Sequence, residues 1–360
     1  MEAMLRLLFL GENWFGSCAR ACSYALRRLG CDVKDFDAQT FFPQLRLKSS
    51  RALVRLAIPR LIKEYNQQLL EAAECFQPDF LLAFKGTYVL AETLRELRRL
   101  NIPLYNYYPD RILLARGTPI ERAISEYDCV FDTKCYWDGD ACQHYRVRKR
   151  VFLPHGYDPE VHRPCSLDKR DREQFACDVS LIASHMPIKE EIVASLIRLR
   201  PKLDLRIWGN QWREHCRSRA VQKLVRGPAI NGFGYSKAVL ASRINLALMG
   251  VTPNARDETS TRTYEIPACG GFMLHERTAE VQKLFVEDRE IACFGSIDEL
   301  AEKIEYYLAR PDERLAIARC GNMRCVPAYS YDVRMAEILR WHCQREKVLP
   351  DPPEIAATVS

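Results

Sequence analysis

Two carboxylates, Asp257 and Glu265, stand on either side of a short polar loop that leads into a Gly-Gly turn and an apolar strand. The loop offers backbone N–H groups, hydroxyls and a guanidinium to an anion, and its members are Glu258, Thr259, Ser260, Thr261 and Arg262. A helix N-terminus stabilises an exposed anion by about 0.3–1 kcal/mol, and a charge-assisted hydrogen bond contributes about 1.5–3 kcal/mol. We predict that Glu265 starts a short helix closed by Gly270 and Gly271, and that the loop before it binds a diphosphate.

Short apolar runs alternate with amphipathic helical stretches along the chain, which is the pattern of parallel sheets built from βαβ units. In the first half the predicted strands are LRLLFLG, CDVKDFD, PDFLLAFKG, PLYNYYPD, YDCVFDTK and RVFLPHGYD, with helices over 17–29 and 51–75. In the second half they are DVSLIASH, LDLRIWG, INLALMG, GGFMLHE and EIACFG. We therefore predict an α/β protein with two Rossmann-like domains, residues 1–160 and 161–330, joined through HGYDPEVHRPCSLDKRDREQF. Residues 331–360 are expected to form a helix over 331–346 that returns to the first domain, followed by a loose tail.

Chemistry in such sheets is expected in the loops beyond the carboxyl ends of the strands. The loop GENWFGS after the first strand, with Asn13 and Trp14, can bring backbone close to an acceptor or a phosphate, and a structural turn is the equal alternative. Asp110 ends another strand and can orient or deprotonate an acceptor hydroxyl. An N-cap or a salt bridge with Arg111 is the alternative for Asp110.

Three further side chains of the first half are assigned to the cleft. Tyr107 and Tyr108 are candidates for a surface on which a sugar stacks. His155 lies in the interdomain hinge, whose Gly156 and Asp158 are interpreted as turn formers. The chain has neither G-x-G-x-x-G nor G-x4-G-K-[ST], which argues against a nicotinamide dehydrogenase and against a P-loop kinase.

Composition sets the class of protein. An apolar content of 48% over 360 residues is sufficient for two domains with separate cores. The net charge of +6 is spread along the chain, so no nucleic-acid partner is expected. No apolar run approaches the roughly 18–20 residues that span a bilayer, and LRLLFLG is too short for a signal peptide, so a soluble cytoplasmic protein is expected. The fifteen cysteines form no paired C-x-x-C sites and are interpreted as buried reduced thiols, without zinc or disulfides.

The spacing of Asp257 and Glu265 resembles that of retaining nucleotide-sugar glycosyltransferases of the GT-B fold, in which two acidic residues separated by seven others bracket such a loop. With YEIPACGGFML and the later segment ELAEKIEYYLARPDERLAIARCG, the chain resembles the CgeB-like (spore-maturation) glycosyltransferases over nearly its whole length. The resemblance implies that Asp257 contacts hydroxyls of the donor sugar and that Glu265 contacts the ribose. The paired acids favour retention at the sugar. Relatives with the strict motif have Glu at the first position, so the shorter Asp257 leaves inversion as the alternative.

The same resemblance implies donor-binding roles for two other loops of the second half that follow strands. It implies that Lys189 neutralises the leaving diphosphate, with Ser184 and His185 in the same loop. The alternative for Lys189 is a solvated surface lysine, and the alternative for His185 is a cap on the turn. The nucleobase would lie against a segment of the chain made of Gly232, Phe233, Gly234 and Tyr235. A glycine-rich turn before a helix is the plainer interpretation of that segment.

These assignments predict a glycosyltransferase that moves a sugar from a nucleoside diphosphate sugar to an acceptor hydroxyl. Asp257, Asp110 and Arg262 are the predicted catalytic residues, no metal is expected because Arg and Lys take its place, and the DGD at 138–140 is interpreted as a surface turn. The donor is a substrate, no cofactor is permanently bound, and the resemblance implies a saccharide or protein acceptor in bacterial glycosylation. A nucleotide-sugar epimerase of the same fold and an inactive nucleotide-sugar-binding scaffold are the alternatives, and a homodimer is left open.

Overall fold

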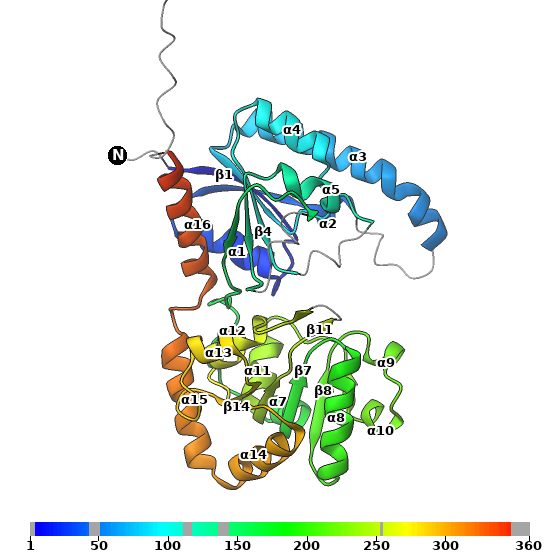
Figure 1. Cartoon of the computed structure of the whole chain (residues 1–360), viewed down its shortest axis with the longest axis vertical. Helices are drawn as coiled ribbons and strands as arrows, with labels where there is room; N and C mark the ends of the chain where they lie inside the picture. The colour runs from blue at the N-terminus through cyan, green and yellow to red at the C-terminus, as the bar shows by residue number, and fades with distance from the viewer. Residues whose placement is uncertain (1–3, 43–50, 111–116, 136–143, 253–254, 347–360) are drawn as a thin grey trace, which may run out of the picture.

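The computed structural model describes residues 4–42, 51–110, 117–135, 144–252 and 255–346. Within these ranges the chain forms two six-stranded parallel sheets that lie one above the other along the long axis (Figure 1). The first sheet has the order β2-β1-β3-β4-β5-β6, and its strands are β1 Arg6–Gly11, β2 Asp32–Asp37, β3 Phe80–Phe84, β4 Leu104–Tyr108, β5 Cys129–Asp132 and β6 Arg150–Phe152. The second has the order β14-β13-β10-β7-β8-β9, and its strands are β7 Cys177–Ile182, β8 Leu205–Trp208, β9 Val225–Gly227, β10 Ser242–Ala247, β13 Met273–Glu276 and β14 Ala292–Phe294. The predicted α/β class with two Rossmann-like sheets is confirmed.

Helices cover both faces of the first sheet, because alternate strand residues point to opposite sides. Leu8 and Leu81 face one cluster with residues of α3, α4 and α5, whereas Leu7 and Phe80 face another with residues of α1 and α16. The helices of this half are α1 Cys18–Arg28, α2 Ala38–Phe41, α3 Arg51–Phe76, α4 Ala91–Arg99, α5 Ile120–Ala123 and α16 Tyr331–Glu346, with a 3₁₀ turn over Ile124–Glu126. Both faces of the first sheet are therefore buried, as expected for a parallel sheet.

The second sheet is covered in the same way. Leu181, Leu246 and Leu274 lie in one buried cluster, and Ile182, Ala247 and Met273 in the other. The helices are α7 Lys169–Phe175, α8 Pro187–Leu199, α9 Trp212–His215, α10 Arg219–Gln222, α11 Phe233–Ala241, α12 Thr261–Ala268, α13 Ala279–Leu284, α14 Ile297–Ala309 and α15 Pro311–Cys325. Among the described residues, no helix has both the length and the apolar character to cross a bilayer.

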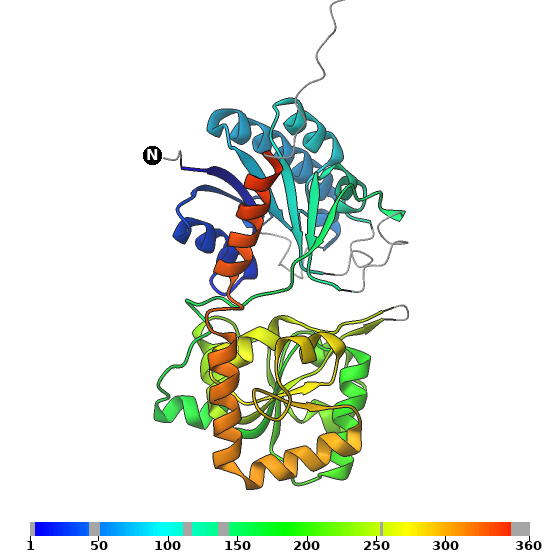
Figure 2. The same cartoon turned by 60° about the vertical axis from the view of Figure 1, so that its left-hand side comes forward.

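Two chain segments cross between the halves side by side. The N–H of Tyr157 donates to Tyr329 O at 3.1 Å, and the N–H of Tyr331 donates to Tyr157 O at 2.9 Å. After this crossing α16 runs along α1 on the first sheet (Figure 2), where the hydroxyl of Tyr105 lies 2.8 Å from Nδ1 of His342. The division into domains at residues 160 and 330 stays a prediction.

Some local features differ from the sequence-based expectations. The edge strand β9 was not expected, because a three-residue segment with an exposed arginine carries no periodicity. A two-stranded hairpin, β11 Val251–Thr252 and β12 Ala255–Arg256, precedes the predicted anion loop. Three thiols, those of Cys75, Cys165 and Cys343, are exposed, so the interpretation of the cysteines as buried is wrong for these. The DGD segment lies outside the described residues.

Candidate functional site

Each sheet has a switch point where successive connections turn to opposite sides, and ligands of such sheets bind beyond the strand ends there. The switch lies between β1 and β3 in the first sheet and between β7 and β10 in the second. Loops after β1, β3 and β7 line two cavities, of about 260 and 250 Å³. We call the one lined mainly by the first half the first-sheet cavity, and the one between the halves the interface cavity. They share the lining residues Trp14, Ser17, Cys18 and Thr261 and therefore adjoin.

The interface cavity lies between the loop after β1 and the second half. From the first half it is lined by Trp14, Gly16, Ser17 and Cys18. Its polar or glycine lining from the second half comprises His162, Ser184, Gly209, Asn231, Gly232, Tyr235, Thr261, Arg262 and Glu265. Six of the predicted donor-side residues thus meet here: Ser184, Gly232, Tyr235, Thr261, Arg262 and Glu265.

Helix α12 carries the charged groups of this cavity. It begins at Thr261 after Ser260, whose extended backbone donates its N–H to Thr263 Oγ1 at 3.0 Å. The expectation that Glu265 starts the helix is therefore wrong, because Ser260 is the preferred kind of residue before a helix. Arg262 and Glu265 are three residues apart in the helix, so they share one face.

Arg262 lines the interface cavity with a guanidinium that has unused hydrogen-bond donors. Its Nη2 lies 3.5 Å from the carbonyl oxygen of Leu248, whereas its Nε is buried and has no partner among the described residues. Buried polar groups are almost always hydrogen-bonded, so an exception that lines a cavity points to a ligand. A guanidinium binds carboxylate or phosphate oxygens in a planar fork.

Glu265 is held beside two neutral rings. Its Oε1 lies 3.9 Å from Nε2 of His162, and the ring of His162 packs edge-on to Tyr235 with centroids 5.3 Å apart. Burial lowers the pKa of His162, although Glu265 opposes that shift, and the N–H of Asp158 donates to His162 Nδ1 at 3.0 Å. A carboxylate next to a neutral imidazole is an acceptor for ligand hydroxyls, such as those of a ribose.

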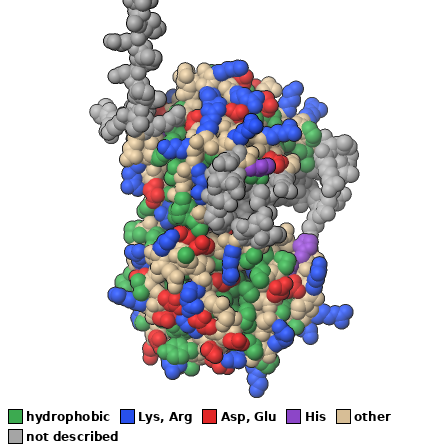
Figure 3. Space-filling view, viewed as in Figure 1, with side chains coloured by type: hydrophobic (Ala, Val, Ile, Leu, Met, Phe, Trp, Pro, Cys, Tyr) green, Lys and Arg blue, Asp and Glu red, His purple; other side chains and the backbone are tan. Residues whose placement is uncertain are grey.

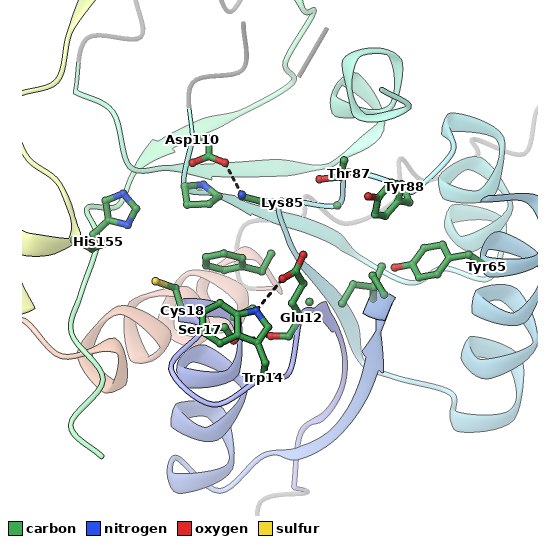
Figure 4. A pocket seen from close by; sticks show the side chains of 18 residues that line it. Glu12, Trp14, Ser17, Cys18, Tyr65, Lys85, Thr87, Tyr88, Asp110 and His155 are labelled. Carbon is green, nitrogen blue, oxygen red and sulfur yellow. Dashed lines mark hydrogen bonds and ion pairs between the residues drawn. The ribbon is translucent and has the colours of Figure 1, made fainter. Parts of the chain in front are cut away.

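The first-sheet cavity runs from His155 at one end to Tyr65 and Tyr88 at the other (Figure 4). Near its middle, Lys85 Nζ lies 2.6 Å from Asp110 Oδ2. Burial lowers the pKa of Lys85, but the pair with Asp110 outweighs burial and raises the pKa overall. Lys85 has a φ of 67°, an uncommon conformation for a lysine that is enriched at binding sites. Asp110 lines this cavity and pairs with Lys85, whereas Arg111, the alternative partner, lies outside the described residues.

His155 offers a free hydrogen-bond acceptor at the start of this cavity. Its buried Nδ1 has no hydrogen-bond partner among the residues described. Burial and the positive charges of Lys134 and Arg262 lower the pKa of His155 well below its usual value. A neutral imidazole that donates through Nε2 leaves Nδ1 as an acceptor, so a donor such as a substrate hydroxyl can bind there.

Two residues predicted to serve the phosphates are placed elsewhere. Lys189 is buried, 4% exposed, and its Nζ lies 3.4 Å from Ser184 O, so neither the diphosphate role nor the solvated alternative fits. It shares the buried face of α8 with Ile192 and Leu196. His185 binds Glu190 at 2.8 Å through Nε2 and packs on Trp212. Neither residue lines the interface cavity.

Five predicted cleft or base-binding residues also lie outside both cavities. Tyr108 is buried on the first sheet, in the cluster of α3 and α4, because β4 is covered on both faces; Tyr107 is buried as well and donates to Pro154 O. Asn13 is exposed, with its Nδ2 3.3 Å from Asp35 Oδ2. The ring of Phe233 packs on Phe15, and Gly234 follows in the first turn of α11.

Most of the predicted anion loop is used to support neighbouring structure. The N–H of Glu280 donates to Glu258 Oε2 at 2.8 Å, so Glu258 caps α13. Thr259 is buried, and Ser260 precedes α12. Asp257 pairs with Lys134 of the first half at 3.1 Å. None of these four loop residues lines either cavity.

One group of the described residues has metal-ligand spacing. The thiol of Cys135 and the carboxylates of Glu258 and Glu280 lie within 4.8 Å of one another. Burial raises the pKa of Cys135 to about 11, and both carboxylates add to the shift. The thiol is therefore protonated at neutral pH in the metal-free protein, and a metal ion would have to displace this proton on binding.

Sequence reasoning missed several residues that line the cavities, among them Cys18, Lys85 and His162. A signal existed for Lys85, which precedes a glycine at the end of a predicted strand. His162 lies in the hinge, where no periodicity points to a ligand. It comes into place only through the chain crossing.

Comparison with known proteins agrees with this geometry. Residues 170–340 match the family model described as "Glycosyl transferase-like". No curated protein sequence matches the chain. Among solved structures, sucrose-phosphate synthase from Thermosynechococcus elongatus has a TM-score of 0.66 and 11% identity, with 96% of this chain and 100% of that chain covered. HepE of Anabaena in complex with UDP-glucose has a TM-score of 0.61 and 15% identity, with 94% and 100% covered.

The chain therefore has the GT-B fold that these structures share, and residues 170–340 are similar to the glycosyl transferase-like family. The same fold is also used by epimerases. UDP-GlcNAc 2-epimerase from Neisseria meningitidis has a TM-score of 0.52 and 12% identity, with 94% of this chain and 100% of that chain covered. Identities at this level show the fold alone, so the reaction must be argued from the site.

Proposed function

We propose that the protein transfers a sugar from a nucleoside diphosphate sugar to an acceptor hydroxyl. The observation that carries the proposal is the shared face of α12, on which the unsatisfied guanidinium of Arg262 and the carboxylate of Glu265 both line the interface cavity. A cation for phosphates and an acceptor for ribose hydroxyls, three residues apart, fit the two polar parts of a nucleoside diphosphate. The HepE complexes with UDP and UDP-glucose support this choice of ligand.

The donor would lie along the interface cavity. Glu265 would accept from the ribose, Gly232 and Tyr235 would border the base, and Arg262 with the N-terminus of α12 would bind the diphosphate. When the nucleotide departs, negative charge grows on the β-phosphate. Preorganised donors at that position are usually the largest contribution to the rate.

The acceptor would enter from the first-sheet cavity. Since the two cavities adjoin at Trp14, Ser17, Cys18 and Thr261, the transferred sugar would lie at this junction. The free Nδ1 of His155 would accept a hydrogen bond from the attacking hydroxyl. The Lys85–Asp110 pair would bind further hydroxyls of the acceptor. Asp257 lines neither cavity, and its role at the donor sugar rests on the family resemblance alone.

Further details belong to the same proposal. We infer a metal-independent reaction, in which Arg262 supplies the positive charge that a cation otherwise provides, with retention as the expected outcome. The CgeB-like resemblance favours a cytoplasmic bacterial enzyme with a saccharide or protein acceptor. Basic and acidic side chains are interspersed on the face shown in Figure 3, and the expected lack of a nucleic-acid partner stays a prediction.

An epimerase is the second candidate, because an epimerase of known structure shares the fold and because His155 and Asp110 line one cavity. Incubation with UDP-, GDP-, dTDP- and ADP-sugars in the absence of any acceptor separates the two. We expect slow release of the nucleoside diphosphate from one donor, through transfer to water, and no change in the sugar of the remaining donor. An isomerised nucleotide sugar, detected by NMR of the donor pool, would instead identify an epimerase.

A further inference from the structure

The first-sheet cavity has different linings at its two ends. His155 lies at one end, the Lys85–Asp110 pair lies near the middle, and Tyr65 and Tyr88 lie at the other end (Figure 4). The proposed function assigns roles to the first three of these residues and none to the two tyrosines. We call the part of the cavity lined by Tyr65 and Tyr88 the tyrosine end.

The tyrosine end belongs to an apolar cluster of the first half. Tyr65 and Leu10 are buried members of that cluster, and Tyr88 and Ala38 pack against it half-buried, while all four line the cavity. Burial raises the pKa of both tyrosines, so their phenols stay neutral. Burial of an apolar group is favourable, whereas a hydroxyl that leaves water without a new hydrogen bond costs free energy. The tyrosine end therefore suits an apolar group better than a bare sugar.

The rings at the tyrosine end are held in place by the protein itself. The ring centroid of Phe42 lies 4.2 Å from that of Tyr88 and 5.9 Å from that of Tyr65. The backbone around Tyr88 is tied to α3 by Asn66, whose Nδ2 donates to Tyr88 O at 2.8 Å and whose Oδ1 accepts from the N–H of Leu90 at 2.9 Å. A site whose side chains are already ordered binds its ligand at a lower entropic cost.

The charged side chains of the cavity are engaged within the protein. Lys85 Nζ lies 2.6 Å from Asp110 Oδ2. Glu12 Oε2 accepts from Trp14 Nε1 at 2.9 Å and from Gln39 Nε2 at 3.1 Å. A charged ligand would have to compete with these contacts, so the lining favours a neutral ligand.

We propose that the acceptor is a neutral molecule with an aromatic group, which binds against Tyr65 and Tyr88 while its reacting hydroxyl lies at His155. The inference rests on the proposed function, because it names the class of acceptor that the same cavity would take. Aromatic rings favour offset-stacked and edge-on contacts with other rings, and the tyrosine end offers two of them. An aryl glycoside has both parts, since its hydroxyls can reach His155 and the Lys85–Asp110 pair while its ring lies at the tyrosine end.

Calorimetry tests this with protein saturated by the nucleoside diphosphate that it binds. The probes are the phenyl and methyl β-glycosides of glucose, galactose and N-acetylglucosamine. We expect the phenyl glycoside of a sugar that binds to have about tenfold higher affinity than its methyl partner, because the ring adds aromatic contacts and buried area. Tyr88→Ala should reduce this preference to about twofold or less, and Tyr88→Phe should retain it, because the contact is made by the ring. Ala38→Leu, which narrows the cavity at the same cluster, should also lose the preference.

Tyr24→Ala is the matched control, at an exposed tyrosine of α1 that lines neither cavity. Tyr88 does not line the interface cavity, so unchanged nucleotide affinity in Tyr88→Ala shows that the variant is folded. Equal affinity for phenyl and methyl glycosides, a preference that persists in Tyr88→Ala, or no binding of any phenyl glycoside to the nucleotide-loaded wild type would each overturn the inference. Failure of the proposed function has a different sign, which is that wild-type protein binds no nucleoside diphosphate at all.

Discussion

Replacement of Arg262 by Gln is expected to lower kcat/KM for the productive donor by about 10²–10³, the range found when one preorganised donor to a developing oxyanion is removed. The neutral amide keeps hydrogen-bonding groups near the cavity but removes the charge that would meet the diphosphate. The fold should survive, because the guanidinium makes one long hydrogen bond, to Leu248, and its Nε has no partner among the described residues.

Steady-state rates at several donor concentrations check this prediction. Arg289→Gln, at an exposed arginine of the second half, is the matched control and should leave kcat/KM unchanged. Thermal denaturation without ligand separates loss of the site from loss of the fold. If Arg262→Gln retains full kcat/KM, Arg262 does not stabilise the leaving group and the assignment of the diphosphate position is wrong.

Replacement of His155 by Phe is expected to reduce kcat by about 10² or more, the usual contribution of a positioned acid–base group. Phenylalanine conserves the ring but removes the Nδ1 that is free to accept a proton or a hydrogen bond. Because His155 lines the first-sheet cavity and not the interface cavity, the affinity for the nucleoside diphosphate should not change.

His155→Asn is the informative companion variant, since the Asn Oδ1 can take the position of the imidazole Nδ1. It should retain more activity than His155→Phe. His144→Phe, at an exposed histidine, controls for substitution of a histidine as such. A His155→Phe protein that transfers at the wild-type rate would show that His155 is a packed hinge residue, and a parallel loss of nucleotide affinity would place it on the donor side.

The helices and strands, and the polar face of α12, could be predicted from the sequence. Apolar runs followed by amphipathic stretches predict the βαβ order, and the helix over 331–346 is found with those bounds. Ser260 before a run of helix-forming residues marked the true start of α12, and it was overlooked in favour of Glu265. The spacing of Arg262 and Glu265 already placed both groups on one face.

The burial of individual side chains was harder to predict, although signals existed. Lys189 occupies the same helical face as Ile192, Val193 and Leu196, and this period of three and four indicated a buried position. Tyr108 lies in a strand whose residues are all buried, and a continuous apolar strand has no solvent face for sugar stacking. A polar residue at a strand end was therefore not sufficient evidence for a place in the cleft.

Contacts between the halves could not be predicted from the sequence, because they depend on how the two halves pack against each other. Lys134 and Asp257 are far apart in the chain, and nothing local to either predicts the ion pair. His162 reaches Glu265 only because the hinge segment crosses beside 329–331. Such residues have no period and no motif of their own.

A thermal-shift screen against UDP, GDP, dTDP, ADP and CMP tests most directly whether the interface cavity binds a donor nucleotide. A ligand at about 100 times its dissociation constant stabilises a protein by about 2.7 kcal/mol, so the correct nucleotide should raise the melting temperature clearly. We expect one nucleoside diphosphate to do so and the effect to disappear in Glu265→Ala. If none of the five shifts the wild-type protein, or if the shift persists in Glu265→Ala, the donor site proposed here is contradicted.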